Sequence, residues 1–248
     1  MIVGQFFDGS GTGNQLFRYV ATRVIAKDKG VDFAMANPEK FKGEGWMKID
    51  KGVEIPHGKE LKNFKEREVR TQDGIDIRPY DPDVNFIEDD TLIDGEFQDE
   101  RYFEHRLDEV REWLKVEPLE VPDDVCVIGF RGGEYKLFPD LYLTKQYWDK
   151  AVLAVLLEHP DIKFEVHTDD PEEAKKFFPD YPIIHDVEKN WKAVRFAKHL
   201  IIANSSFYIL PALLNENVDR VYAPRYWARR NIGLWALPQN WYKKFTYL

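Results

Sequence analysis

The chain has 248 residues, 44% of them hydrophobic and 32% charged, which is typical of a globular protein with one large domain or two small ones. A formal net charge of −9 argues against general nucleic-acid binding, because no basic surface is indicated. The single cysteine excludes a disulfide within the chain. No basic leader and no run of 18 apolar residues is present, so we expect a cytoplasmic protein without a transmembrane segment.

The first part of the chain predicts a β-loop-α-β unit. Residues 2–7 read as a strand, residues 14–29 as a helix with apolar side chains at helical spacing, and residues 31–36 as a second strand. The glycine-rich loop 8–13 can present backbone amides to an anion. It is neither a dinucleotide fingerprint, whose third glycine position is Asn14 here, nor a P-loop. A turn of purely structural use is the alternative.

The middle of the chain is less regular. Residues 37–90 are polar and poorly periodic, which indicates short strands and loops. A strand is expected at 91–97 and a helix at 104–114. Segment 116–124 carries two prolines among acidic residues and is the best candidate for a linker between domains.

The second half alternates strands and helices. The expected strands are 125–130, 163–167, 183–185, 200–203 and 220–223, and the expected helices are 144–158, 171–178, 191–198 and 207–215. Such alternation predicts a parallel sheet with right-handed crossovers. We therefore expect an α/β protein of two Rossmann-like lobes, residues 1–116 and 124–248.

Polar side chains follow three strands of this second half. They are Arg131 and Glu134 after the first strand, Thr168, Asp169 and Asp170 after the second, and Asn204, Ser205 and Ser206 after the fourth. The carboxyl ends of parallel strands share one edge of a sheet, so these groups should face one ligand. An arginine fork and a helix start suit a diphosphate, and a carboxylate such as Asp169 can accept hydrogen bonds from a ribose or a base.

Each of these groups also has a simpler interpretation. Ser205 can serve only as a helix N-cap, and the two aspartates can serve only to begin a helix. Asp169 and Asp170 also have the chemistry of metal ligands, but no third carboxylate or histidine follows at a suitable spacing. We expect no metal site.

Seven segments, in order along nearly the whole chain, resemble those of the α-1,2-fucosyltransferases, glycosyltransferase family 11. They are GTGNQLFRYVATRVIA at Gly11, GEFQDERYF at Gly95, GFRGGEY at Gly129, HTDD at His167, ANSSFYILPALL at Ala203, APRYW at Ala223 and LPQNW at Leu237. The Gly-Asn-Gln-x-Phe and Asn-Ser-Ser-Phe strings together are rather specific to that family.

The resemblance implies a GT-B-like fold with an N-terminal acceptor-side lobe and a C-terminal lobe that binds the nucleotide sugar. It implies an inverting, metal-independent transfer of fucose from GDP-fucose to a glycan hydroxyl, without any cofactor beyond the donor. Arg131 would then stabilise the diphosphate leaving group. The donor-binding residues would be Gly13, Asn14 and Gln15 from the first lobe, and Thr168, Asp169, Asp170, Asn204, Ser205, Ser206 and Phe207 from the second.

A carboxylate is expected to deprotonate the acceptor hydroxyl, and the candidates are Glu134 and Asp8. Glu134 can equally be a structural partner of Arg131, and we favour that role slightly. Both candidates are placed in the catalytic set with Arg131.

The chain departs from the family pattern in the segment around Arg131. Gly129 stands where the family has histidine, Gly132 where it has a second arginine, and Glu134 where it has aspartate. Loss of one phosphate-facing arginine removes roughly 1.5–3 kcal/mol of charge-assisted bonding. The protein O-fucosyltransferases, more distant relatives, also keep a single arginine in this motif.

These departures leave several alternatives open. A second cation is expected, if anywhere, from Arg225, Arg229 or Arg230, although a solvated basic patch is the simpler interpretation. One alternative is a donor with another sugar or nucleotide, and another is an inactive fucosyltransferase-like protein that binds a nucleotide or a glycan. An oxidoreductase with a nicotinamide cofactor is disfavoured by the broken glycine spacing.

Overall fold

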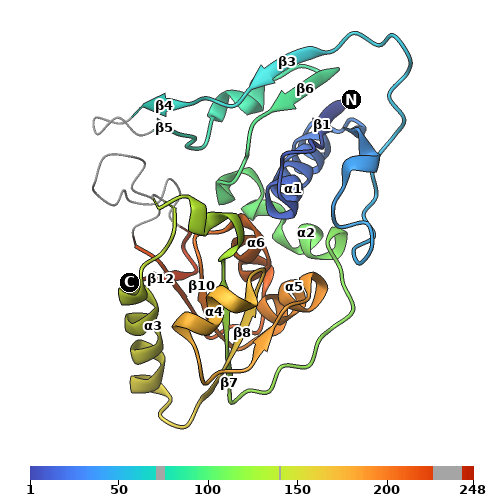
Figure 1. The fold of residues 1–248 in the computed structure, drawn as a ribbon. Helices are drawn as coiled ribbons and strands as arrows, with labels where there is room; N and C mark the ends of the chain where they lie inside the picture. The colour runs from blue at the N-terminus through green and yellow to red at the C-terminus, as the bar shows by residue number, and fades with distance from the viewer. Residues whose placement is uncertain (71–75, 140, 226–241) are drawn as a thin grey trace. The chain divides into compact units, whose positions relative to one another are not determined.

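The computed structural model describes residues 1–70, 76–139, 141–225 and 242–248. The chain forms two compact units, residues 1–116 and 117–248, and each is built on its own parallel sheet (Figure 1). This architecture confirms the expected α/β class with two parallel sheets.

Unit 1 has a four-stranded parallel sheet in the order β2-β1-β6-β3. Its strands are β1 (Ile2–Gln5), β2 (Phe33–Ala36), β3 (Lys62–Lys65) and β6 (Thr91–Asp94). Helix α1 (Thr12–Lys29) connects β1 to β2 and ends at Gly30, which adopts the left-handed φ of 68° that favours glycine. The helix packs directly on β1, because a Cβ at Gly4 would lie 2.2 Å from the Thr22 hydroxyl.

The rest of unit 1 is made of short elements. They are the antiparallel pair β4 (Val69–Arg70) and β5 (Asp76–Ile77), four 3-10 turns (Pro38–Lys40, Pro82–Phe86, Glu100–Tyr102 and Glu104–Arg106) and helix α2 (Leu107–Trp113). The strand expected at 91–97 ends at Asp94, because Phe97 takes a positive φ of 50° that no strand accommodates. The helix expected from residue 104 starts as a 3-10 turn and becomes α-helical at Leu107.

Unit 2 has a six-stranded parallel sheet in the order β12-β11-β10-β7-β8-β9. Its strands are β7 (Val125–Phe130), β8 (Lys163–Thr168), β9 (Ile183–Ile184), β10 (His199–Ile202), β11 (Arg220–Ala223) and β12 (Phe245–Tyr247), and its helices are α3 (Lys145–Glu158), α4 (Pro171–Phe177), α5 (Val187–Phe196) and α6 (Ser206–Leu214). Numbered within the unit, this is the 3-2-1-4-5-6 order of a Rossmann sheet.

Helices cover both faces of the unit 2 sheet (Figure 1). Phe130 packs on Trp148 of α3, at 5.2 Å between ring centroids, while a Cβ at the preceding Gly129 would lie 2.8 Å from the ring of Tyr208 in α6. Successive strand residues point to opposite faces, so α3 and α6 lie on opposite sides of β7. The strand order thus places a crossover point between β7 and β10.

Two predictions for unit 2 are wrong in detail. The helix expected at 191–198 runs from Val187 to Phe196, because the Asp186 side chain caps it by accepting the Lys189 amide at 2.9 Å. Strand β12 was not expected, since three residues are too few for an apolar pattern. It is specified by its pairing with β11.

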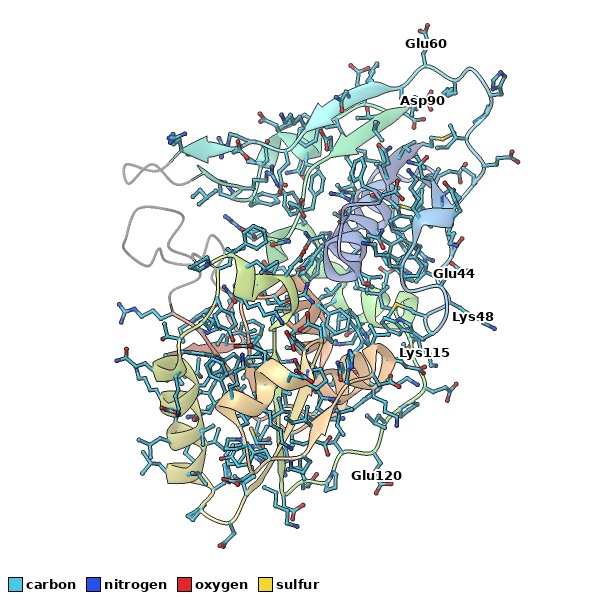
Figure 2. The ribbon with its side chains drawn as sticks, viewed as in Figure 1. Glu44, Lys48, Glu60, Asp90, Lys115 and Glu120 are labelled. Carbon is cyan, nitrogen blue, oxygen red and sulfur yellow. The ribbon has the colours of Figure 1, made fainter. Side chains whose placement is uncertain are left out.

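The acidic surplus of the chain lies at its surface. Figure 2 shows the side chains of Glu44, Glu60 and Glu120 projecting outward, and all three are exposed. Among the described residues, no helix is long and apolar enough to cross a membrane.

Candidate functional site

The candidate site lies at the carboxyl ends of β7 and β10 in unit 2. These strands are paired in parallel, with Ile202 opposite Gly129. Arg131 follows β7 directly, and Ser205 lies three residues after the end of β10 and directly before α6. The connections from β7 and β10 lead to helices on opposite faces, and α/β proteins generally bind ligands beyond the strand ends at such a point.

Arg131 is held in place by the end of the neighbouring strand β8. Its Nη1 donates to Asp169 Oδ2 at 2.5 Å, and the Gly132 amide donates to Asp169 Oδ1 at 3.0 Å. Its Nη2 donates to Glu134 Oε1 at 3.0 Å. The buried Nε–H makes no hydrogen bond to any described residue. Asp169 therefore orients both the guanidinium and the backbone that follows it.

Tyr135 links Arg131 to the end of β10. The guanidinium lies over the Tyr135 ring, 5.3 Å from its centroid, and the phenol donates to the Asn204 carbonyl at 3.4 Å. The phenol also interacts with the Ser205 hydroxyl, and burial raises its pKa, so it stays neutral as a hydrogen-bond donor. The structure thus brings together Arg131 and Ser205, which the sequence placed 74 positions apart.

The start of α6 carries no cap from its own sequence. Ser205 is extended at φ −123°, its side chain makes no cap hydrogen bond, and the first turn of the helix has no acidic residue. The positive end of the helix dipole is therefore not compensated by a side chain of α6. Together with Arg131, it gives this corner of the sheet the elements of an anion site.

The remaining unit 2 residues of the expected set have internal roles in the structure. The Thr168 hydroxyl is fully buried and accepts the Asp170 amide at 2.9 Å. Asp170 caps α4 by accepting the Glu173 amide at 3.1 Å, which is the simpler of the two interpretations considered for it. Asn204 is buried and donates to the Leu141 carbonyl at 3.0 Å.

Ser206 and Phe207, the last two residues of that set, are the first two residues of α6. The Phe207 ring packs edge-on against Trp191 of α5, at 5.6 Å between centroids. This contact joins α5 to the first turn of α6 and so fixes where that turn lies.

The charges around Arg131 are predominantly negative. Two cations, Arg131 and Lys136, stand against three carboxylates, Glu134, Asp169 and Asp170, and Lys136 is paired with Asp170. Glu134 is the most accessible of the three, with 64% of its side chain exposed. An anion that binds Arg131 must therefore displace Glu134, whereas Asp169 can stay in place.

The expected residues of the first lobe lie in unit 1. Gln15 is fully buried, and its amide group donates to the Lys40 carbonyl at 2.8 Å and accepts the Lys42 amide at 2.9 Å. Asp8 is 80% exposed and pairs with Lys40 at 2.8 Å. The carboxylate of Asp8 is thus accessible, whereas the side-chain amide of Gln15 already makes its hydrogen bonds within unit 1.

Gly13 and Asn14 belong to the first turn of α1. Gly13 is buried, and the Asn14 Oδ1 accepts a hydrogen bond from Gln98 at 3.1 Å. This bond ties the start of α1 to the loop after β6.

The glycines that depart from the family pattern are explained by packing. A Cβ at Gly129 would lie 2.8 Å from the Tyr208 ring, and a Cβ at Gly132 would lie 2.7 Å from the Asp170 Cβ. The Tyr208 phenol donates to the carbonyls of Phe130 at 3.1 Å and His167 at 2.9 Å, so it joins the ends of β7 and β8. Neither position has room for a side chain without movement.

The candidates for a second cation are placed only in part. The Arg225 amide donates to the Leu248 carbonyl at 2.9 Å, and Arg225 lines a cavity of about 330 Å³ beside the start of α3. Arg229 and Arg230 lie outside the described residues, as do the LPQNW segment and the end of the APRYW segment. Among the described residues, no group of three His, Cys, Asp or Glu side chains is placed to hold a metal ion.

Sequence reasoning missed Tyr135 and Tyr208, which hold the site together. Both lie within the segments that carry the resemblance, one residue beyond Glu134 and Phe207. An apolar helical context for Tyr208 predicts core packing, and nothing in it indicates the two carbonyls that its hydroxyl bonds.

No model of a known protein family matches the chain, and neither does any curated protein. Among solved structures, E. coli heptosyltransferase WaaC with ADP-2-deoxy-2-fluoro heptose aligns at a TM-score of 0.50 and 10% identity, covering 100% of this chain and 93% of that one. WaaC with ADP gives 0.46 at 12% identity, over 91% and 87% of the two chains. NodZ α-1,6-fucosyltransferase soaked with GDP-fucose gives 0.45 at 13% identity, over 89% and 93%.

The likeness to the first of these structures concerns the fold. Together with the two parallel sheets, it confirms the GT-B-like fold class. Membership of the α-1,2-fucosyltransferase family stays a prediction based on the sequence segments.

Proposed function

We propose that this chain is a glycosyltransferase that binds a nucleotide-sugar donor at the carboxyl edge of the unit 2 sheet. The observation that carries the proposal is the position of Arg131 beside the uncapped start of α6, at the crossover point of a Rossmann-ordered sheet. A guanidinium and a helix N-terminus are the two groups that proteins use most readily for a diphosphate. The solved heptosyltransferase with this fold holds an ADP-heptose analogue, which is a nucleotide sugar.

In finer detail, we propose fucose from GDP-fucose as the transferred group and a glycan hydroxyl as the acceptor, on the strength of the sequence segments shared with the fucosyltransferases. The bond between the anomeric carbon and the diphosphate oxygen breaks, and the acceptor oxygen bonds to that carbon from the opposite side. Negative charge develops on the leaving diphosphate, where Arg131 and the α6 dipole stabilise it without a metal ion. The acceptor proton passes to a carboxylate, for which the exposed Asp8 is the better candidate.

Glu134 fits a different role. Its carboxylate is bonded to Arg131 at 3.0 Å, so in the absence of donor it occupies the guanidinium edge that a phosphate would take. We therefore assign Glu134 as a partner of Arg131 rather than as the base.

The test is nucleotide binding by the intact chain. Thermal unfolding with GDP, UDP, ADP, CDP, dTDP and NAD(P) identifies the nucleotide, and calorimetry then compares Arg131→Ala with the parent. Arg220→Ala is the matched control, because Arg220 is also paired with a carboxylate but lies at the amino end of β11, at the opposite edge of the same sheet. We expect at least tenfold weaker binding for Arg131→Ala and transfer lowered by at least two orders of magnitude, about 2.7 kcal/mol.

Equal affinities for the parent and Arg131→Ala, or stabilisation by NAD(P) alone, would refute the proposal. A second candidate, a fucosyltransferase-like protein that binds the nucleotide without turnover, is favoured by the two carboxylates that already hold Arg131. Release of GDP from the donor, with and without glycan acceptors, separates this candidate from an enzyme.

A further inference from the structure

Unit 1 has a polar cavity of its own, at the carboxyl ends of its strands. Its volume is about 410 Å³, within the range of small-molecule sites, and its walls come from the loops after β1 and β6 and from the end of β3. Asn14, which the sequence predicts as a donor-binding residue, is part of its lining, but the proposed function above places the donor at unit 2 and assigns this cavity no ligand.

The loop after β6 is shaped around a buried carboxylate. Glu66 is only 2% exposed, and its Oε2 accepts the amides of Glu96 at 2.7 Å and Phe97 at 3.0 Å. A Cβ at Gly95 would lie 2.4 Å from the Glu66 Cβ, and Phe97 holds a positive φ of 50°. A non-glycine residue persists in that conformation only where its surroundings impose it, so the wall of the cavity is pre-formed.

A buried arginine holds the same wall from the helix side. Arg18 Nε donates to the Gly95 carbonyl at 2.9 Å and Nη1 to the Gln5 carbonyl at 3.2 Å. Its guanidinium also lies 3.8 Å from Glu96 Oε1. Arg18 therefore joins the ends of β1 and β6 across the floor of the cavity.

Three oxygen atoms of the cavity lining have no hydrogen-bond partner among the described residues. They are Ser10 Oγ, Glu66 Oε1 and Glu96 Oε2, and all three are buried from water. The Tyr102 phenol interacts with the Glu66 carboxyl, whose pKa is raised by burial, but it makes no hydrogen bond to Oε1. Buried acceptors without donors are costly, and three in one cavity indicate a ligand that supplies donors.

The charge of the lining selects among such ligands. Three cations, Arg18, Lys65 and Arg78, stand against three carboxylates, Glu66, Asp94 and Glu96. A balanced lining offers no net attraction to an anion or a cation, whereas the unpaired acceptors require hydroxyl or amide hydrogens. Gly9 and Lys65 are the exposed members of the lining, and Arg78 is half-buried.

We propose that this cavity binds a neutral, hydroxyl-rich molecule, a sugar or polyol, whose hydroxyls donate to Ser10, Glu66 and Glu96. Such a ligand would be the acceptor of the transfer reaction, and that assignment rests on the proposed function. The proposal that the cavity binds a sugar or polyol does not rest on it.

Saturation-transfer NMR on the intact chain tests the proposal, with neutral sugars (glucose, galactose, mannose, N-acetylglucosamine) as probes. Glucosamine and glucose 6-phosphate serve as the cationic and anionic arms. We expect at least one neutral sugar to bind, and to bind more tightly than its charged analogue.

Two variants locate the site. Ser10→Ala and Glu96→Ala should each weaken binding of that sugar at least fivefold, whereas Glu44→Ala, an exposed carboxylate of the same unit, should not. Ser10 lies between two glycines whose surroundings are open, so its variant should fold even if Glu96→Ala does not.

Absence of saturation transfer to every neutral sugar, a preference for a charged analogue, or unchanged affinity in Ser10→Ala would overturn the proposal. GDP binding is measured in the same samples. If GDP binds and no sugar does, only the unit 1 site fails. If a sugar binds and no nucleotide does, the site stands and the transferase proposal fails.

Discussion

Replacement of Glu134 by glutamine should strengthen nucleotide binding. In the structure Glu134 Oε1 accepts from Arg131 Nη2 at 3.0 Å, and this guanidinium edge is the one a phosphate would occupy. Asp169 and the Gly132 amide still orient Arg131 in the variant, because those contacts do not involve Glu134. The substitution therefore removes a competing charge and leaves the cation in place.

The size of the effect follows from the exposure of the pair. Two like charges about 4 Å apart repel by about 1 kcal/mol in water and about 4 kcal/mol at an effective dielectric constant of 20. The Glu134 side chain is 64% exposed, so the value for water is the appropriate one, and exposed ion pairs contribute about 0.2–1 kcal/mol. We expect a gain of about 1 kcal/mol, which is roughly a fivefold lower Kd.

Isothermal titration of GDP, or of the nucleotide that the thermal panel selects, measures this change. Glu158→Gln is the control, because Glu158 pairs with Arg220 at the opposite edge of the same sheet. The gain should shrink in high salt, since screening weakens exposed charge interactions. An unchanged or weaker affinity in Glu134→Gln would refute our assignment, and a loss of transfer with improved affinity would indicate that Glu134 is the base after all.

Three further predictions concern the scaffold. Gly129→Ala should lower the free energy of unfolding by about 1–3 kcal/mol, because its Cβ would overlap the Tyr208 ring. Gly9→Ala, whose Cβ meets nothing within 4 Å, should change this free energy little. Urea denaturation measures both variants, and equal losses of stability would contradict the packing argument. Asn215→Ala should lower the free energy of unfolding by at least about 2 kcal/mol in the same assay. The buried side-chain amide of Asn215 donates to two carbonyls at the end of α5 and accepts from two backbone amides of the turn that follows Asn215. A much smaller loss of stability would show that water replaces these hydrogen bonds. Burial raises the pKa of Glu66, so the folded chain holds that proton more tightly, and the resulting stability is complete below about pH 4 and lost as pH rises through the raised pKa. Glu66→Gln should therefore gain stability relative to the parent between about pH 4 and pH 8, and a difference that is independent of pH would contradict this.

The bounds predicted most accurately from the sequence are those of elements whose stability comes from their own residues. The buried strand β7 has the expected bounds 125–130, and α1 ends at Gly30 as its glycine indicated. The edge strands were predicted least accurately. Strand β3 (Lys62–Lys65) is lysine-rich and largely exposed, so no apolar alternation reveals it, and its pairing with β6 is what makes it a strand.

The candidate site was predictable to the level of strand ends and no further. The rule that parallel strands end at one edge brought Arg131 and Ser205 to the same corner. It did not show that the two carboxylate oxygens of Asp169 would accept hydrogen bonds from Arg131 and from the Gly132 amide. Such contacts depend on side-chain conformations and on loop paths, which residue spacing does not determine.

Two departures from the fucosyltransferase pattern, Gly129 and Gly132, are each explained by the packing of a neighbouring side chain. A histidine at position 129 would require the Tyr208 ring to move, yet the Tyr208 hydroxyl joins the carbonyl ends of β7 and β8. An arginine at position 132 would likewise displace Asp170, which caps α4. Neither family side chain can therefore be introduced without movement of Tyr208 or Asp170, whose atoms lie where the new Cβ would be. Under the proposed function, Arg131 and the start of α6 are the described groups that would meet the charge of a diphosphate, so we expect the carboxylates that hold Arg131 to influence how tightly a nucleotide binds.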